Sequence, residues 1–374
     1  MKIRMFDLAI TEKKKINVYS QKFSKFLKKG VFFLGPEVKK FEQNICKFLN
    51  IKYAVAVSSG SSALYLSLKA CGIKKNDEVI LSPLGWIITA QAIKSCGAKP
   101  VFADVSDDLN IDPKDIEKKI TKNTKAIVPM HYAGHICKMD KIISLAKKYN
   151  LKVIEDAAQS FGSTINGKKS GTFSDAAAFS MNPMKSFGGL GENGIVVTNS
   201  KKIYEKIKIL RHAGTISDPN KIITNYCNEV SLNHKMDPLN AIFLNINLKY
   251  FKKKLKTKNK ISRKYLLSFK NNHNIISQDE FIDFNKETPG RYVFPILVNK
   301  RDKLQKFLTK KKIETKIFHL PLMNNTPVFN SLKKDKTPNA QKLVNKLLIL
   351  PLNEKLIDKE INYIISTIKK FYKN

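Results

Sequence analysis

The sequence predicts an α/β protein with a mostly parallel central sheet, helices on both of its faces, and a smaller C-terminal α+β domain. From about residue 53 onward, short β-branched runs alternate with amphipathic segments, which is the order that a parallel sheet covered by helices requires. After about residue 245 this alternation gives way to long helical patterns. A chain of 374 residues exceeds what one core usually supports, so we expect a large domain over residues 1–245 and a small one over 246–374.

Seven apolar runs are expected to form the strands of the large domain. They lie at residues 53–58, 78–82, 100–105, 126–131, 152–157, 175–180 and 194–198. Helical patterns lie between most of them, at residues 61–72, 88–97, 112–120 and 138–150. Gly72 and Gly97 stand where two helices should end, and Asp112 before Pro113 is typical of an N-cap followed by a first-turn proline. This order predicts a doubly wound sheet.

The C-terminal third has a different pattern. A long lysine-rich helical stretch follows residue 245, and an apolar run at 292–298 precedes a helical pattern at 301–312. Residues 353–373 are strongly periodic, as in a helix that packs one face against a core. Few strands among long helices indicate a smaller α+β domain.

Charge is the most unusual property of the composition. The chain has 68 Lys and Arg residues against 31 Asp and Glu residues, a formal net charge of +37. Such a balance is compatible with nucleic acid, an acidic membrane surface or small anionic substrates. The lysines are spread through almost every segment, and neither a zinc-finger spacing nor an aromatic RNA-binding motif is present. Nucleic acid is therefore not an expected partner, and a general lysine-rich bias stays an alternative explanation of the charge.

Cysteine use and hydropathy indicate the compartment. The five cysteines are widely scattered and include no C-x-x-C pair, which favours free thiols in a reducing environment. Residues 1–15 contain too short an apolar stretch for a signal peptide, and nowhere do about eighteen apolar residues run together. We expect a cytoplasmic protein with no membrane partner.

Chemically active residues follow four of the predicted strands. Ligands of open α/β sheets bind beyond the carboxyl ends of the strands, so these residues are candidates for one site. The first segment is SSGSSAL at residues 58–64, which opens a helix whose free N–H groups and dipole favour a phosphate. Ser61 and Ser62 would add hydroxyl groups. The same string also suits a serine-rich N-cap, and the segment alone does not decide between the two.

Two further strand ends carry an aromatic residue and an acid. Trp86, the only tryptophan, either fills a core or interface or offers a flat face to an aromatic ligand. Asp156 ends an apolar strand, where a carboxylate is costly to bury without a partner. A protonated pyridine nitrogen would be a suitable partner, and capping of the next turn is the alternative. Glu155 should point to the other face and is expected to be structural.

The fourth strand end is the run FSMNPMKSFGGLGENG at residues 179–194. Lys185 is either an ordinary solvated cation or a buried amine that forms a Schiff base with a carbonyl. The four segments together supply a phosphate cradle, an aromatic face, an acid for a pyridinium and an amine. These are the groups that pyridoxal phosphate needs from a protein.

The motifs around these residues resemble those of the DegT/DnrJ/EryC1/StrS family of sugar aminotransferases, which are fold-type I pyridoxal-phosphate enzymes. The resemblance runs over nearly the whole chain through FFLGPEVKKFE, SSGSSALYLSL, DEVILSPLGWIITAQAIKSCGAKPVFADV, KAIVPMHYAGHICKMD, VIEDAAQSFGS, FSMNPMKSFGGLGENGIVVT, SLNHKMDPLNA and IETKIFHLPL. So many motifs in one order are highly specific. The resemblance implies transfer of an amino group from glutamate to a nucleotide-linked keto-sugar, making an amino sugar for surface polysaccharide, glycan or secondary metabolite synthesis.

The resemblance also implies individual roles. Lys185 would form the Schiff base with pyridoxal 5'-phosphate and move the substrate proton, while Asp156 would pair with the pyridine nitrogen and Gln159 with the ring hydroxyl. Asn233 would reach the phosphate of a neighbouring subunit, which implies a homodimer with shared active sites. The full set of implied cofactor-binding residues is Ser61, Ser62, Trp86, Asp156, Gln159, Ser180, Lys185 and Asn233.

Three residues are expected to contact the substrate: His131, Lys235 and His319. Lys235 stands where the family has arginine, and the two side chains are not interchangeable at a carboxylate. No metal is expected, because His131 and His135 fall in a predicted loop. Two alternatives stay open: a sugar dehydratase of the same family, whose members replace the lysine with histidine, and a binding or regulatory protein that keeps the cofactor fold.

Overall fold

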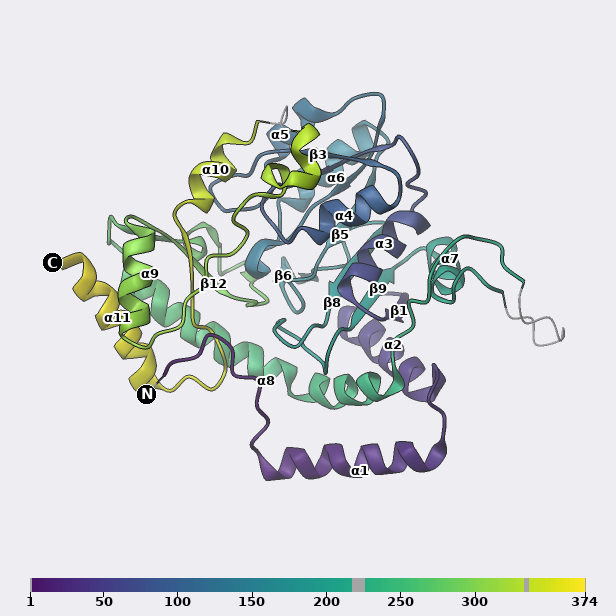
Figure 1. Ribbon diagram of the computed structural model, residues 1–374, viewed down its shortest axis with the longest axis horizontal. Coiled ribbons are helices and arrows are strands. Elements are labelled where there is room, and N and C mark those ends of the chain that lie inside the picture. The colour runs from purple at the N-terminus through teal and green to yellow at the C-terminus, as the bar shows by residue number, and fades with distance from the viewer. Residues whose placement is uncertain (1, 217–225, 333–335, 374) are drawn as a thin grey trace.

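The structure, a computed structural model, describes residues 2–216, 226–332 and 336–373. Its centre is a seven-stranded sheet with the order β1-β9-β8-β5-β4-β2-β3 (Figure 1). These strands span Tyr53–Val57 (β1), Glu78–Leu81 (β2), Lys99–Phe102 (β3), Thr124–Val128 (β4), Lys152–Asp156 (β5), Ala176–Ser180 (β8) and Gly194–Thr198 (β9). Each predicted strand is confirmed. Strand β9 is antiparallel to β1 and β8, and the other neighbours are parallel, so the predicted class is correct.

Helices cover both faces of this sheet because side chains alternate along each strand. In β1, Val55 and Val57 face a core shared with α3, α4 and α7, whereas Ala54 and Ala56 face a core shared with α2 and α8. Helices α5 and α6 continue the second layer over β3 and β4. These helices span Gly35–Leu49 (α2), Gly60–Ala70 (α3), Ile88–Ser95 (α4), Pro113–Lys119 (α5), Met139–Lys148 (α6), Lys201–Arg211 (α7) and Pro238–Phe269 (α8).

The predicted helix ends follow local chemistry. Gly72 and Gly97 have φ angles of 87° and 77°, in the left-handed region that glycine enters without strain. The carboxylate of Asp112 accepts a hydrogen bond from the amide of Lys114 at 3.0 Å and so caps α5. Both predictions are confirmed.

Helix α8 joins the two parts of the chain. It runs without a break across residues 245 and 246, where we expected the boundary, and the division into two domains stays a prediction. Its first half packs on the large sheet with α2, and its second half contributes Ile261, Tyr265 and Phe269 to a separate core. The expected tail helix begins a few residues late, at Asp358, and joins this second core.

The second core surrounds a three-stranded antiparallel sheet, β10-β12-β13. The strands and helices of this part of the chain span Ile275–Ser277 (β10), Phe294–Val298 (β12), Leu347–Leu350 (β13), Arg301–Lys310 (α9), Pro338–Val344 (α10) and Asp358–Lys373 (α11). A third sheet is formed by Glu287–Thr288 (β11), Thr164–Ile165 (β6) and Lys168–Lys169 (β7). The N-terminal segment also contributes to the second core through Ile3, so the first residues lie with the last ones.

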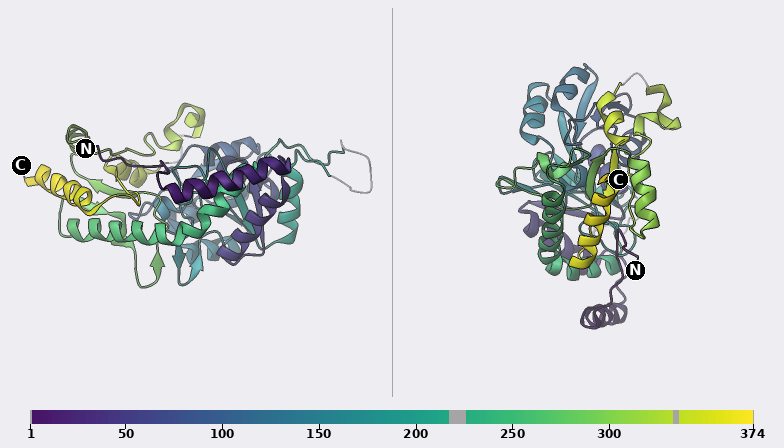
Figure 2. Two further views of the ribbon diagram at one scale, coloured as in Figure 1. Left: turned by 90° about the horizontal axis from the view of Figure 1, so that it is seen from below. Right: turned by 90° about the vertical axis from the view of Figure 1, so that its left-hand side faces the viewer.

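Helix α1 (Lys13–Lys29) lies at the outer edge of the molecule and packs on α8 (Figures 1 and 2). Tyr19 and Phe26 form its buried contact with Ile242, Phe243 and Ile246 of α8. Among the residues that the structure describes, no helix has the length and apolar composition needed to cross a membrane.

Candidate active site

The candidate residues predicted from the sequence gather at one edge of the central sheet. Strands β4, β5 and β8 run in the same direction, so their carboxyl ends meet there. Asp156 is the last residue of β5, Ser180 is the last residue of β8, and Lys185 lies in the loop that follows β8. Strand order therefore places an amine beside a buried carboxylate.

The carboxylate of Asp156 is buried and held by two donors. The hydroxyl of Thr89, on α4, donates to Oδ2 at 2.7 Å, and the amide of Ala158 donates to Oδ1 at 3.2 Å. Burial nevertheless raises the pKa of Asp156 above its usual value, and the nearby positive charge of Lys185 opposes this effect. A buried anion in this state gains stability when a cation such as a protonated ring nitrogen lies beside it.

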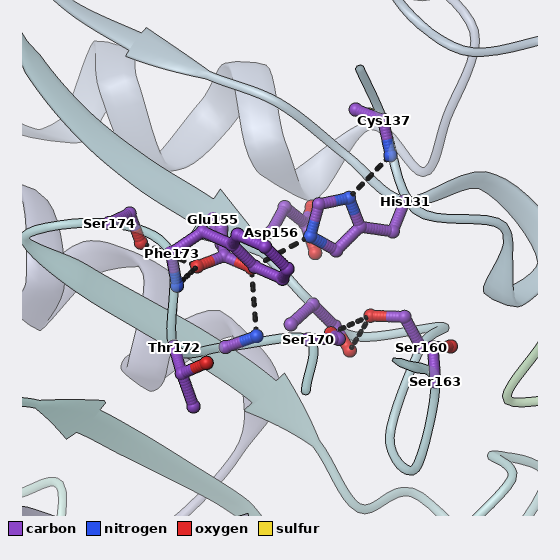
Figure 3. Close-up of polar contacts among 12 residues, drawn as sticks. His131, Cys137, Glu155, Asp156, Ser160, Ser163, Ser170, Thr172, Phe173 and Ser174 are labelled. Carbon is purple, nitrogen blue, oxygen red and sulfur yellow. Dashed lines mark hydrogen bonds and ion pairs between the residues drawn. The ribbon is translucent and has the colours of Figure 1, made fainter. Parts of the chain in front are cut away.

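The side chain of Glu155 points to the opposite side of β5, as expected, and has a full set of hydrogen bonds (Figure 3). Its Oε2 accepts from His131 Nε2 at 2.8 Å and from the Gly171 amide at 2.7 Å. Its Oε1 accepts from the Phe173 amide at 2.9 Å and from the Ser174 hydroxyl at 2.8 Å. These donors keep the pKa of Glu155 below its usual value even though burial acts in the other direction.

The same network fixes the tautomer of His131. It also places this side chain inside the protein, whereas we expected it to contact the substrate. The amide of Cys137 donates to Nδ1 at 3.2 Å, so the ring proton lies on Nε2 and is donated to Glu155. The side chain is fully buried. With both nitrogens bonded inside the protein, His131 has no atom left for the predicted contact with a substrate, and it supports the β5 strand end instead.

The amine of Lys185 has an unusual environment. Its Nζ lies 4.4 Å from the centre of the Tyr292 ring, and within the described ranges it has neither an ion pair nor a hydrogen-bond acceptor. Burial lowers its pKa to about 8, while the charges of Asp156 and Glu192 act in the opposite direction. An amine with this pKa exists partly in its neutral, nucleophilic form near neutral pH.

The glycines after Lys185 allow the loop to fold tightly. A Cβ at Gly188 would lie 2.5 Å from the carbonyl oxygen of Pro183, so only glycine fits there. The amide of Gly189 returns to the carbonyl of Met181 at 2.8 Å and closes the loop. This closure keeps Lys185 within a short loop that begins at the end of β8.

The beginning of α3 lies against the end of β8. A Cβ at Gly60 would lie 2.5 Å from the Cβ of Ser180, which places Ser180 at the N-terminus of the helix beside Ser61 and Ser62. A helix N-terminus with nearby hydroxyls suits a phosphate group. The amide of Ser62, one of the implied cofactor-binding residues, donates to the N-cap hydroxyl of Ser59 at 3.1 Å.

Gln159 and Trp86 present groups suited to an aromatic ligand. The side-chain oxygen of Gln159 accepts from the Ala133 amide at 2.8 Å, while among the described residues its NH₂ group faces the sulfur of Met130, at 3.8 Å. Since a thioether is a weak acceptor, this buried NH₂ can donate to a ligand oxygen. The side chain of Trp86 is 65% exposed, just before α4.

The remaining predicted residues divide into two groups. His319 lies near Lys185, and burial, with the charge of Lys185, lowers the pKa of its ring to about 3, so the ring is neutral. Asn233 and Lys235 instead lie beyond β1, where Lys235 Nζ is 2.9 Å from His212 Nδ1. The side chain of Asn233 is exposed, and the next residue, His234, lies with Nδ1 2.9 Å from the hydroxyl of Ser62.

Sequence reasoning missed Thr89 and Tyr292. Thr89 lies in the segment WIITA, one helical turn after Trp86, and its position beside a strand end was a usable signal. Tyr292 begins the apolar run that includes β12, and nothing local indicates its contact with Lys185.

The groups in this site match the parts of pyridoxal phosphate. The amine of Lys185, which is partly neutral near pH 7, suits the aldehyde of the cofactor, and the carboxylate of Asp156 suits its ring nitrogen. The NH₂ group of Gln159 suits the ring hydroxyl. The N-terminus of α3, with Ser180 beside it, suits the phosphate. A site of this kind at the carboxyl edge of a mostly parallel sheet defines a pyridoxal-phosphate-dependent transferase.

The chain belongs to the DegT/DnrJ/EryC1/StrS aminotransferase family, whose model matches residues 14–369. It is 33% identical over 350 residues to a pleiotropic regulatory protein of Geobacillus stearothermophilus, covering 92% of this chain and 91% of the relative. It is 32% identical to the dTDP-3-amino-3,6-dideoxy-alpha-D-galactopyranose transaminase of Aneurinibacillus thermoaerophilus, with 94% of each chain covered.

The fold is also that of solved aminotransferase structures. The chain superposes on DesV of S. venezuelae, solved with a ketimine intermediate, with a TM-score of 0.93 and 26% sequence identity. The match covers 100% of this chain and 99% of DesV. The protein is therefore a pyridoxal-phosphate-dependent aminotransferase of the family that acts on nucleotide sugars.

Proposed function

We propose that this protein transfers an amino group from an amino acid, with glutamate the expected donor, to a keto-sugar carried on a nucleoside diphosphate. The observation that carries the proposal is the partly buried amine of Lys185 near the buried carboxylate of Asp156 at one sheet edge, with the N-terminus of α3 beside them. The product would be an amino sugar for a polysaccharide, glycan or secondary metabolite. The Aneurinibacillus relative, a transaminase of a dTDP-linked deoxysugar, supports this substrate class.

When bound, pyridoxal phosphate supplies an aldehyde that takes up the amino group and a ring that withdraws electrons from the neighbouring carbon. Asp156 would hold a proton on the ring nitrogen, with Thr89 and the Ala158 amide keeping its carboxylate oriented. The NH₂ group of Gln159 would donate to the ring hydroxyl. Trp86 would cover one face of the ring and exclude water from it.

Lys185 would hold the cofactor and then act as the base. Its pKa of about 8 leaves a neutral fraction that accepts the proton from the carbon bearing the amine. The resulting ammonium would then pass this proton from the substrate carbon to the cofactor. The short loop after β8 keeps the amine at one place during both transfers.

The substrates we propose are anionic, and the protein is strongly basic, with a formal net charge of +37. A positive surface raises the local concentration of anions and their rate of association. Lys235 is our candidate for the donor carboxylate, and His319, neutral and close to Lys185, for the sugar.

We also propose a homodimer with shared active sites. Trp86 and Leu232 are strongly exposed, and the adjacent Asn233 is exposed as well, although the family resemblance assigns Trp86 and Asn233 to cofactor binding. A second copy that covers these residues would complete both sites. Size measurement in solution tests this proposal, and a monomer with full activity would contradict it.

Two alternatives have less support. A family dehydratase replaces the Schiff-base lysine, and Lys185 is present here in an environment suited to nucleophilic chemistry. A regulatory protein is suggested by the name of the Geobacillus relative. Such a protein would have no need of an amine of lowered pKa near a buried carboxylate.

The test is spectroscopic and chemical. Purified protein mixed with pyridoxal phosphate should show the absorbance band of a lysine Schiff base, and Lys185→Ala should lose it while the exposed-lysine control Lys202→Ala keeps it. Incubation with glutamate and a panel of nucleotide-linked 3-keto and 4-keto sugars, followed by mass analysis, should yield an amino sugar. A band that survives in Lys185→Ala would refute the site, and turnover of no sugar would refute the substrate class.

A further inference from the structure

Tyr292 lies against the amine of Lys185, although the two residues are far apart in the sequence. The ring centre is 4.4 Å from Nζ, and the tyrosine side chain is only 6% exposed. The face of an aromatic ring attracts a cation, and more strongly where water is excluded. The described residues offer Lys185 no hydrogen-bond acceptor, so Tyr292 is a direct contact that stabilises the charged form of the amine, in addition to the charges of Asp156 and Glu192.

The main chain that carries Tyr292 passes through a narrow gap. The amide of Gly290 donates to the Ser163 hydroxyl at 2.8 Å, and a Cβ at Gly290 would lie 2.6 Å from the same oxygen. Arg291 follows with a φ angle of 56°, in the left-handed region that residues other than glycine seldom adopt. The Tyr292 amide then donates to the carbonyl of Ala133 at 3.3 Å. Such a constrained path indicates that the position of Tyr292 is closely set.

The side chain of Arg291 fastens this segment to its surroundings. Its guanidinium donates to Asp279 at 2.5 Å and to the side-chain oxygen of Asn259, on α8, at 2.8 Å. Arg291 and Asp279 are both buried. A buried pair with good geometry fixes local structure, whatever its net energy.

A buried lysine on α8 completes the arrangement. Lys258 is 4% exposed, and its Nζ donates to the carbonyl of Tyr292 at 3.4 Å. In the described part of the chain Lys258 has no ion pair. The nearby carboxylates of Glu354 and Asp279 are instead paired with Lys254 and Arg291. Burial, together with the charges of Lys254 and Arg291, lowers the pKa of Lys258 to about 7, and the charge of Glu354 acts in the opposite direction. An amine buried at this cost is unusual for a purely structural position.

We propose that Tyr292 and Lys258 are positioning residues for Lys185: the ring of Tyr292 holds the amine, and Lys258 fixes the carbonyl of Tyr292 from α8. The inference rests on the proposed function, in which Lys185 takes a proton from the substrate carbon and returns it. When the amine accepts that proton it becomes an ammonium, and the adjacent aromatic face stabilises it. The segment before β12 thereby connects the C-terminal part of the chain to the chemistry.

The experiment measures the amine itself. Full-length protein is loaded with pyridoxamine phosphate, the cofactor form in which the lysine amine is free, and labelled with acetic anhydride between pH 6 and 10. Mass analysis of the peptide that contains Lys185 then yields its pKa, expected near 8 in the natural protein. Tyr292→Leu should lower this pKa by roughly 0.4 to 1.5, the equivalent of a lost cation–π contact, and Tyr292→Phe should preserve it.

Lys258 is tested with a matched control on the same helix. Lys258→Met should move the pKa of Lys185 in the same direction as Tyr292→Leu and reduce kcat by about 2- to 30-fold with KM little changed. Lys256→Met removes one exposed charge from the same helix and should leave both quantities unchanged. Lys258→Gln serves in place of Lys258→Met if that variant does not fold.

The outcomes separate this inference from the proposed function. If Tyr292→Leu leaves the pKa of Lys185 and kcat unchanged, or raises that pKa, the role of Tyr292 is refuted. If Lys258→Met behaves as Lys256→Met does, the role of Lys258 is refuted. If instead Lys185→Ala keeps the Schiff-base band, the proposed function itself fails, whatever the result at Tyr292.

Discussion

The substitution Glu155→Gln tests the buried network behind the active site. Glu155 is fully buried, and each carboxylate oxygen accepts two hydrogen bonds (Figure 3). Glutamine has nearly the same shape but only one accepting oxygen. Its NH₂ group must therefore take the position of one carboxylate oxygen, where it meets hydrogen-bond donors rather than acceptors.

The magnitude follows from which donors lose their acceptor. The less costly orientation turns the NH₂ group toward Phe173 and Ser174, because the serine hydroxyl can rotate to accept. The amide of Phe173 is then buried without a partner, which costs about 1–3 kcal/mol, and the bonds from His131 and Gly171 lose their charge assistance. We expect the free energy of unfolding to fall by about 2–5 kcal/mol in total.

The pH dependence supplies an independent readout. The pKa of Glu155 is lowered in the folded protein, so below pH 4.5 the unfolded chain binds a proton that the folded chain resists. The stability from this carboxylate is therefore fully present above that pH and is lost as the pH falls through the folded pKa. Glu155→Gln cannot titrate and should lack this loss.

The assay is urea unfolding of cofactor-free protein at pH 7 and at pH 4, at one protein concentration. Ser174→Ala is the matched control, because it removes a single neutral donor and should cost only about 1 kcal/mol. A loss below about 1 kcal/mol in Glu155→Gln at pH 7, or an unchanged acid dependence, would show that the network does not stabilise this strand end as argued.

Three further predictions concern the cofactor site. The rate of the half-reaction with saturating glutamate should rise with pH through about 8 and then level off. The reason is that the pKa of Lys185 is lowered to about 8, and only its neutral amine accepts a proton. A flat profile would exclude Lys185 as the base. Thr89→Val removes the 2.7 Å hydrogen bond to Asp156, so the pKa of Asp156 should rise further. The affinity for pyridoxal phosphate, measured by fluorescence titration, should fall about tenfold or more. An unchanged affinity would contradict this role of Thr89. Gly60→Ala places a Cβ 2.5 Å from the Cβ of Ser180, and it should lower the stability by about 1–3 kcal/mol and also lower the cofactor affinity. Ser61→Ala, at an exposed position, is the control and should leave the stability unchanged. Equal melting temperatures for the two variants would refute the close packing.

Much of the large domain could be predicted because its signals are local. The apolar runs that became β1 to β5, β8 and β9 are bounded by polar turns, and the glycines at 72 and 97 end helices through their own backbone freedom. Residues directly after parallel strands share an edge by topology alone. Asp156 and Lys185 could therefore be placed together without coordinates.

Other features depend on contacts between distant segments. His131 was expected at the substrate, and only the positions of Glu155 and Cys137 show that its ring is fully used inside the protein. The predicted boundary near residue 245 fell inside α8, because one long helix serves both cores and its periodicity does not show where the partner changes.

The sequence by itself determined the α/β class, the strand ends that carry the chemistry and the pairing of an amine with a carboxylate, because each depends on neighbours in the chain. Only the tertiary structure decided that Tyr292 lies on Lys185 and that Lys258 holds Tyr292. Those contacts join segments far apart in sequence. Their positions follow from how α8 and the segment before β12 pack against the sheet edge, which no local pattern encodes.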